Sequence, residues 1–206
     1  MNTNYNYGSY PYGFAITPQL IILVLLVFVL IWVIITYNRL AKLKNLITES
    51  WSNVDTELRR RYDLIPNLVE TVKAYAAHER AIFEEVANAR SKAISTTGKI
   101  SEQSAAETQL VDALKSLLAV QEAYPNLKAD QNFLHLQKEL VITEDRIQAA
   151  RRFYNGNVRD NNNLVMMFPS KIVAGMFGYQ SSSFFEVQEA VREALRPVFE
   201  DLQKQN

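Results

Sequence analysis

The sequence predicts an all-α protein with an N-terminal transmembrane helix that continues into an elongated antiparallel four-helix bundle. Three observations indicate this fold class. An unbroken apolar run extends from Leu20 to Ile35. Apolar residues then recur with helical spacing through much of the chain, and we find no convincing alternating strand pattern. A helical bundle on a membrane anchor accounts for all three.

The apolar run is the first element. With Phe14 to Thr17 before it and Tyr37 after it, the run is long enough to cross a bilayer core of about 30 Å. We expect residues 1–15 to form a short extracytoplasmic tail, residues 16–37 the transmembrane helix and residues 38–206 the cytoplasmic bundle. A cleaved signal peptide would need a basic start and an Ala-x-Ala site, and neither pattern is present. We therefore expect a retained anchor.

Basic residues predict the orientation. Arg39, Lys42 and Lys44 follow the run, whereas the tail before it has no charged side chain. The positive-inside rule then places the N-terminus outside and the C-terminal part in the cytoplasm of a single-pass inner-membrane protein. The same three residues are our candidates for contact with lipid headgroups. The run lacks Gly, Ala and Ser, so any homo-oligomer is expected to form through the cytoplasmic part.

A long helix is predicted directly after the anchor. Its apolar seam runs from Leu40 to Tyr75, and the stretch NRLAKLKN has neither Gly nor Pro to break it. Pro66 removes a hydrogen bond to the carbonyl of Tyr62 and predicts a kink. The seam keeps its phase past Pro66, so we prefer one kinked helix, which continues to Gly98, over two helices.

Two more helices follow. Ser104 and Glu107 match a capping box, which predicts a helix that begins there and ends at Pro125. The next helix is predicted to start near Asp130 and to continue to Met167.

The stretch FPSKIVAGMFGYQSSS has two glycines, one proline and no clear period, so we predict an irregular connection. It is apolar for a loop, and we expect it to fold back and bury Phe168, Phe177 and Tyr179. A second capping box, Ser183 with Glu186, predicts the start of the last helix, which should bend at a proline further on.

Three consecutive arginines lie before Pro66. Arg59 is roughly 35 Å beyond the anchor along a straight helix, and screening acts over about 8 Å, which disfavours a lipid role. Arg61 falls on the apolar seam, whereas Arg59 and Arg60 flank it. We expect Arg61 to be buried against a carboxylate of the helix after Asp130, with these candidates: Glu139, Glu144 and Asp145. A recognition patch formed by the three arginines is the alternative.

No catalytic, cofactor or metal site is predicted. The chain has no cysteine, which excludes disulfides and zinc–thiolate sites. Neither His78 nor His135 has a glutamate three positions before it, as a di-iron bundle requires. The 22 basic and 22 acidic residues give no basic excess of the kind that nucleic-acid binders show.

Two further patterns are candidate binding surfaces. The stretch RRFYNGNVRDNNNL could recognise a peptide or an anion, although we prefer a solvated helix end. An aromatic cluster could contact a partner or a membrane, although core packing is the preferred interpretation. Its members are Phe168, Phe177, Tyr179, Phe184 and Phe185.

Long blocks of the sequence resemble the LemA family. These are YNRLAKLKNLITESWSNVDTELRRRYDLIPNLVETVKAYAAHE and EAYPNLKADQNFLHLQKELVITEDRIQAARRFYN, followed by FPSKIVAGMFGY and FFE. The resemblance covers about residues 30–193. It implies a bacterial protein with an anchor, a short outside tail and a four-helix cytoplasmic bundle, and it implies no activity and no catalytic residues.

The leading functional hypothesis is a non-enzymatic, membrane-anchored scaffold or adaptor that contacts membrane lipid and an unidentified protein partner. The alternative is a signal-relay protein whose anchor passes a change into the bundle. An enzyme with an unrecognised site is the third hypothesis.

Overall fold

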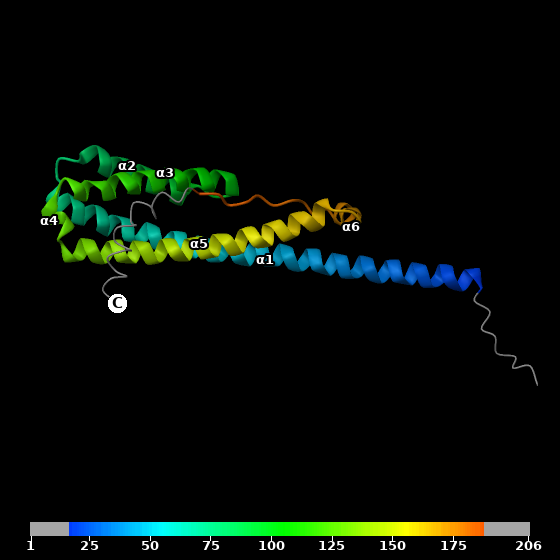
Figure 1. Ribbon diagram of the computed structural model, residues 1–206. Coiled ribbons are helices and arrows are strands. Elements are labelled where there is room, and N and C mark those ends of the chain that lie inside the picture. Colours follow the sequence, from blue (N-terminus) through cyan, green and yellow to red (C-terminus); the bar gives the residue numbers. More distant parts are fainter. Residues whose placement is uncertain (1–16, 188–206) are drawn as a thin grey trace, which may run out of the picture.

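A computed structural model describes residues 17–187, and all regular secondary structure in that range is helical. The predicted all-α class and the long N-terminal helix are therefore confirmed. The elements in chain order are α1 (Pro18–Tyr75), α2 (Arg80–Ser95), α3 (Ile100–Ala119), the 3-10 turn η1 (Val120–Glu122), α4 (Pro125–Lys128), α5 (Gln131–Met166) and α6 (Ser170–Met176). Figure 1 shows an elongated body from which the first part of α1 extends alone.

Helices α1 and α5 form a long antiparallel pair (Figure 1). At the end distant from the N-terminus, the Tyr75 hydroxyl donates to Asp130 at 2.8 Å. In the middle of the pair, the rings of Trp51 and Tyr154 meet edge to face at 5.4 Å. The pairing buries the seam of α1, as its apolar spacing predicts.

Helix α1 passes through Pro66 as one helix, which decides between the two alternatives that the sequence left open. Proline lacks an amide hydrogen, so the carbonyl of Tyr62 loses its helical partner. Arg90 of α2 replaces that partner, since its Nε donates to the Tyr62 oxygen at 2.7 Å. A neighbouring helix thus satisfies the backbone group that the proline leaves open.

The predicted continuation of this helix to Gly98 is wrong, because α1 ends at Tyr75 and α2 begins at Arg80. No glycine or proline marks this break, and local helix propensity favours continuation. Tertiary packing wins instead: Ala76 is fully buried at the turn, and Phe83 is buried on α2.

The predicted capping box at Ser104 is also wrong. Helix α3 begins at Ile100, so Ser104 and Glu107 lie inside it and are buried. The helix ends at Ala119, earlier than predicted, and Pro125 begins the short helix α4.

The predicted start of α5 at Asp130 is confirmed. The Asp130 side chain accepts a hydrogen bond from the Phe133 amide at 2.8 Å and caps the helix.

The connection after α5 contains helix α6, which the sequence did not predict. Its aromatic residues are not buried as expected: Phe168 is 83% exposed and Phe177 is 51% exposed, while Tyr179 is half-buried. Ser183 and Glu186 lie in an extended segment and start no helix within the described range. The rest of the predicted last helix lies outside the described residues.

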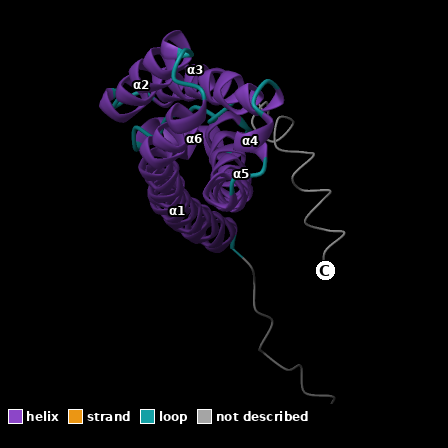
Figure 2. Ribbon diagram, turned by 90° about the vertical axis from the view of Figure 1, so that its left-hand side faces the viewer, coloured by secondary structure: helices purple, strands orange, loops and turns teal. Residues whose placement is uncertain are grey.

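Helices α2 and α3 form a second pair, which lies over the half of α1 and α5 that is distant from the N-terminus (Figure 1). Seen end-on, this pair lies on one side of α1 and α5 (Figure 2). The turn between α2 and α3 places Gly98 at φ 115°, where an L side chain would be strained. This arrangement does not confirm the predicted four-helix bundle, because α1 and α2 both come from one predicted helix and most of the predicted last helix lies outside the described residues.

Candidate functional site

A network of buried charges lies at the centre of the body. Arg61 is 1% exposed and pairs with Glu107 of α3 and with Glu144 of α5, the latter through Nη1 and Oε1 at 2.5 Å. Tyr62 donates its hydroxyl hydrogen to Glu107, and the Gln103 amide donates to the same carboxylate at 2.9 Å. We call these five residues the charge network. Arg61 thus points inward, as its seam position predicts, and joins α1 to both partner helices.

Burial and charge oppose each other at Arg61. Burial alone would lower the pKa of its guanidinium, but the carboxylates of Glu144 and Glu107 outweigh that effect and raise the pKa. For Tyr62, burial and the charge of Glu107 act together to raise the pKa of the phenol. Arg61 therefore stays charged and Tyr62 stays neutral near neutral pH.

Arg59 and Arg60 lie outside this network. Arg59 pairs with Asp55 one turn earlier at 2.9 Å, and Arg60 approaches Glu57 at 3.9 Å. Both arginines are exposed. The three consecutive arginines therefore do not share one surface, although a recognition role for the outer two remains a prediction.

The extended segment 180–187 is held by asparagine side chains of α5. The amide of Asn155 donates to the Phe185 carbonyl at 3.0 Å and accepts from the Phe185 amide at 2.9 Å. Asn162 makes the same double contact with the backbone of Ser182, at 2.9 Å and 2.8 Å. Asn161 adds a bond to the Gln180 carbonyl at 3.3 Å. We call Asn155, Asn161 and Asn162 the asparagine ladder.

The spacing of the ladder explains its register. Asn155 and Asn162 are seven residues apart, which is about 10.5 Å along a helix. Their partners Phe185 and Ser182 are three residues apart, which is about 10 Å in extended chain. Two turns of α5 therefore have about the same length as three residues of the segment. Asn155 and Asn162 each bind the backbone amide and carbonyl of one segment residue, as a neighbouring β-strand would. The asparagine-rich stretch does bind a peptide, and that peptide is the chain's own segment.

Phe185 is the side-chain anchor of this segment. It is fully buried, and its ring meets Trp51 edge to face at 5.2 Å. Tyr154 lies beside the same tryptophan and donates its hydroxyl hydrogen to the Ser183 carbonyl at 2.9 Å. Burial raises the pKa of the Tyr154 phenol, so it remains a donor at neutral pH.

The aromatic cluster that the sequence suggested is two separate groups. Phe184 and Phe185 lie in the segment on the body, where Phe184 is exposed. Phe177 and Tyr179 lie next to Tyr37 of α1, with ring centroids 4.7 and 6.0 Å from it. Phe168 belongs to this second region. No single surface contains all five residues.

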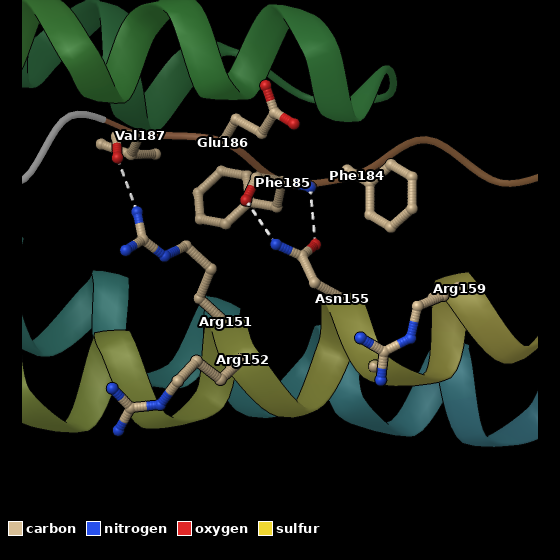
Figure 3. A pocket seen from close by; sticks show the side chains of 9 residues that line it. Arg151, Arg152, Asn155, Arg159, Phe184, Phe185, Glu186 and Val187 are labelled. Atoms are coloured by element: carbon tan, nitrogen blue, oxygen red, sulfur yellow. Dashed lines mark hydrogen bonds between the residues drawn. The ribbon is translucent and has the colours of Figure 1, made fainter.

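A cavity of about 560 Å³ lies where the segment meets α5 (Figure 3). Arg151 points toward the segment and donates to the Val187 carbonyl at 2.6 Å. Three guanidinium groups and one carboxylate line the cavity, so its charge is predominantly positive. Its lining residues are Arg151, Arg152, Asn155, Gly156, Arg159, Phe184, Phe185, Glu186 and Val187.

The predicted membrane-flanking residues Arg39, Lys42 and Lys44 are all exposed on α1. Among the described helices, only α1 has the length and the apolar composition to cross a membrane. Its apolar residues from Leu20 to Ile31 are exposed, as a lipid-facing surface would be.

Several residues of these sites were missed from the sequence. Glu107 was assigned to a helix cap because an S-x-x-E pattern reads the same at a cap and inside a helix. Asn155 and Asn162 were noted only as part of a polar stretch. Their seven-residue spacing on one face was the available signal. Among residues 17–187, no group of three or more His, Asp or Glu side chains could hold a metal ion.

Comparison with known proteins places these features in a family. Residues 50–199 match the LemA family. Two relatives in Paramagnetospirillum magneticum, magnetosome proteins MamQ 1 and MamQ 2, are each 25% identical over 180 aligned positions, which cover 75% of this chain and 66% of the relative. The protein LemA of Metamycoplasma hominis is 24% identical over 75% of this chain and 71% of its own length. This chain spans just under two thirds of the length of the MamQ proteins. Because the family match covers most of the chain, the protein belongs to the LemA family.

Proposed function

We propose that this protein is a non-enzymatic adaptor anchored in the cell membrane, with its N-terminus outside and its helical body in the cytoplasm. The observation that carries the proposal is the continuity of α1. One helix contains both the exposed apolar stretch and the seam around which the body is built. A partner bound to the body would therefore be held at a fixed distance from the membrane.

The charge network supports this role because it fastens the anchor helix to the body. Arg61 of α1 binds one carboxylate on α3 and another on α5. Removing Arg61 would leave two carboxylates buried without their cation, which costs several kcal/mol. A pull on α1 is thus passed to the whole body.

The cavity beside the segment is the partner surface that we favour. Arg152 is exposed there, and within residues 17–187 the one ion-pair contact of Arg159 is with Asp160, at 3.9 Å. Arginine binds carboxylates with paired hydrogen bonds, so an acidic segment of a partner protein fits this surface. Phe184, 42% exposed at the same place, offers it an apolar contact.

Site-specific crosslinking in native membranes tests this assignment. The sequence has no cysteine, so Arg152→Cys gives one attachment point for a photo-crosslinker. Arg146→Cys is the matched control, since Arg146 is exposed on the same helix and does not line the cavity. We expect Arg152→Cys to yield a discrete adduct that Arg146→Cys does not form. Adding Arg159→Glu should reduce the yield at least tenfold.

Equal yields at the two positions, or a yield that Arg159→Glu leaves unchanged, would contradict the proposed partner surface. A strictly monomeric protein that forms no adduct at either position would count against an adaptor as a whole.

The continuity of α1 also favours a second function, the relay of a signal from the anchor to the body. Inserting Gly-Pro after Ile47 would break α1 between the two, whereas the same insertion in the loop at residues 96–99 is the control. If the protein relays a signal, a change at the anchor alters the crosslinking yield at Arg152, and only the insertion after Ile47 abolishes that response. If the protein is an adaptor without relay, crosslinking at Arg152 persists in both insertion variants.

A further inference from the structure

Helix α6 lies against the end of the apolar span of α1. Val173 and Ala174 are buried there against Leu40, with Trp32 and Val33 packed at the edge of the same cluster. Figure 1 shows α6 at the end of the body that faces the isolated part of α1. The C-terminal end of α5 and helix α6 therefore lie where α1 leaves the proposed bilayer.

Helix length places this end within the membrane. The part of α1 that no other described residue covers, Pro18–Ile31, has fourteen residues and is about 21 Å long. A bilayer core is about 30 Å thick, so a helix needs about 20 residues to cross it. Counted from Pro18, the remaining thickness of about 9 Å is crossed by Trp32–Tyr37. Those are the residues beside which α6 is packed.

The outer surface at this end is apolar. Six large side chains are each more than half exposed, and Phe168 at 83% and Met176 at 71% are the most exposed. We call them the apolar tip: Met166, Met167, Phe168, Ile172, Met176 and Phe177. Several large apolar side chains exposed within one short stretch are typical of a site that contacts a partner or a membrane.

Several backbone amides at this end have partners within the protein, as a lipid environment favours. The backbone amide of Lys171 donates to the Met167 carbonyl at 2.8 Å, and that of Tyr179 donates to the Ala174 carbonyl at 2.9 Å. Tyr37 and Tyr179 have the amphipathic character of residues at a membrane interface. Lys171 is exposed, and its long chain lets the ammonium reach the headgroups.

We propose that the apolar tip inserts into the lipid bilayer beside α1, at the end of the span marked by Tyr37, and forms a second membrane contact. The exposed cations Arg39, Lys42 and Lys44 continue this contact at the headgroup level and favour an anionic lipid surface. The body is then fixed to the membrane at two places, which prevents it from pivoting about a single helix. This inference rests on α1 crossing the bilayer, which the proposed function also assumes.

Depth measurements on full-length protein in vesicles of phosphatidylcholine and phosphatidylglycerol test the insertion. Phe168→Cys and Met176→Cys each provide one site for a bimane label, because the native chain has no cysteine. Val24→Cys reports on the span, and Leu134→Cys, exposed near the opposite end of α5, reports on water. The quenchers are aqueous iodide and lipids brominated either near the headgroup or near the chain end.

We expect labels at Phe168 and Met176 to be quenched by the shallow bromines and to be at least fivefold less sensitive to iodide than the label at Leu134. The label at Val24, about 9 Å along α1 from Pro18, should be quenched by brominated lipid and be insensitive to iodide. If the tip labels respond to iodide like Leu134 while Val24 remains in lipid, the tip proposal fails and the anchor survives. If Val24 is also exposed to iodide, both fail. Tip labels that are shielded from iodide but unaffected by brominated lipid would mean that a second copy covers the tip, which also overturns the proposal.

Discussion

The charge network and the asparagine ladder both place polar groups inside the body, but they use them in opposite ways. In the network, Arg61 meets Glu107 and Glu144, so full charges on three helices recognise one another through side chains. In the ladder, the neutral amides of Asn155 and Asn162 bind only backbone atoms of the segment.

This difference shows which structural feature the charge network and the asparagine ladder each determine. A buried ion cluster depends on every member, because one charge left alone in the interior is costly. An amide that binds backbone reads no side chain, so the ladder sets the position of the segment and tolerates changes in its sequence. Specificity enters through Phe185, which fills the site beside Trp51. The network therefore defines which helices associate, and the ladder defines register.

The largest effect is expected from breaking the network at its centre. Arg61→Ala would leave Glu107 and Glu144 buried without their cation, and we expect a loss of about 3–5 kcal/mol in the free energy of unfolding. Urea unfolding of the full chain in detergent, followed by circular dichroism, measures it. Arg60→Ala is the control, since this arginine is exposed and should cost less than about 1 kcal/mol. Equal losses for the two variants would show that the buried cluster contributes nothing special.

A pH series distinguishes the charge network, which contains the titratable Tyr62, from the asparagine ladder, whose side chains do not titrate. Tyr62→Phe removes a hydrogen bond to a charged partner and should cost about 1.5–3 kcal/mol near neutral pH. The pKa of Tyr62 is raised in the folded protein, so its contribution is complete below its unfolded pKa of about 10 and is lost as pH rises beyond that value. The stability gap between wild type and Tyr62→Phe should therefore narrow above pH ~10. A gap that widens there would contradict the assignment.

Breaking the ladder should have a smaller and local effect. Asn155→Ala removes both bonds to Phe185, each contributing about 0.5–1.5 kcal/mol. We expect the hydrogen exchange of the Phe185 amide to accelerate by roughly five- to a hundredfold, with little change at Leu110 in the core. Asn163→Ala, at an exposed position of the same helix, should change neither amide. Faster exchange throughout the body would mean that the ladder supports the whole fold.

The smallest expected effect concerns the other side of the segment. Ser104 of α3 accepts a hydrogen bond from the Glu186 amide at 3.2 Å. Ser104→Ala should accelerate exchange of that amide by less than about tenfold, since one neutral bond contributes about 1 kcal/mol. Ser101→Ala, exposed on the same helix, should leave it unchanged. An effect larger than that of Asn155→Ala would make α3, and not the ladder, the main support of the segment.

Local and periodic features could be predicted from the sequence. The apolar seam gave the continuity of α1 and the inward direction of Arg61, and Asp130 marked the start of α5 through a cap formed within four residues. Glu144 was among the three candidate partners of Arg61, but the sequence did not choose among them and did not indicate Glu107.

Features that depend on distant contacts could not be predicted. The break after Tyr75 has no glycine or proline and follows from packing of α2 against α3. The ladder joins Asn155 to Phe185, thirty residues later, through backbone atoms that every residue possesses. Such a contact leaves no complementary pattern in the segment, so only the spacing of the asparagines hints at it. Phe168 and Phe177 of the apolar tip were wrongly predicted to be buried, because exposed and buried aromatic residues look alike in sequence.

The extended segment has a mechanical consequence. Extended chain rises about 3.3 Å per residue, close to its maximum reach, so the stretch from Tyr179 to Phe185 has almost no slack. A displacement of α6 away from the body cannot be absorbed by stretching. It must move each asparagine to the next residue of the segment, and a shift of one residue turns Phe185 to the opposite face. The segment therefore stays in place under small forces and shifts along α5 only in steps of one residue. The first such step removes Phe185 from its contact with Trp51. A distance between labels on Met176 and Arg146 that varied smoothly under load would contradict this stepwise behaviour.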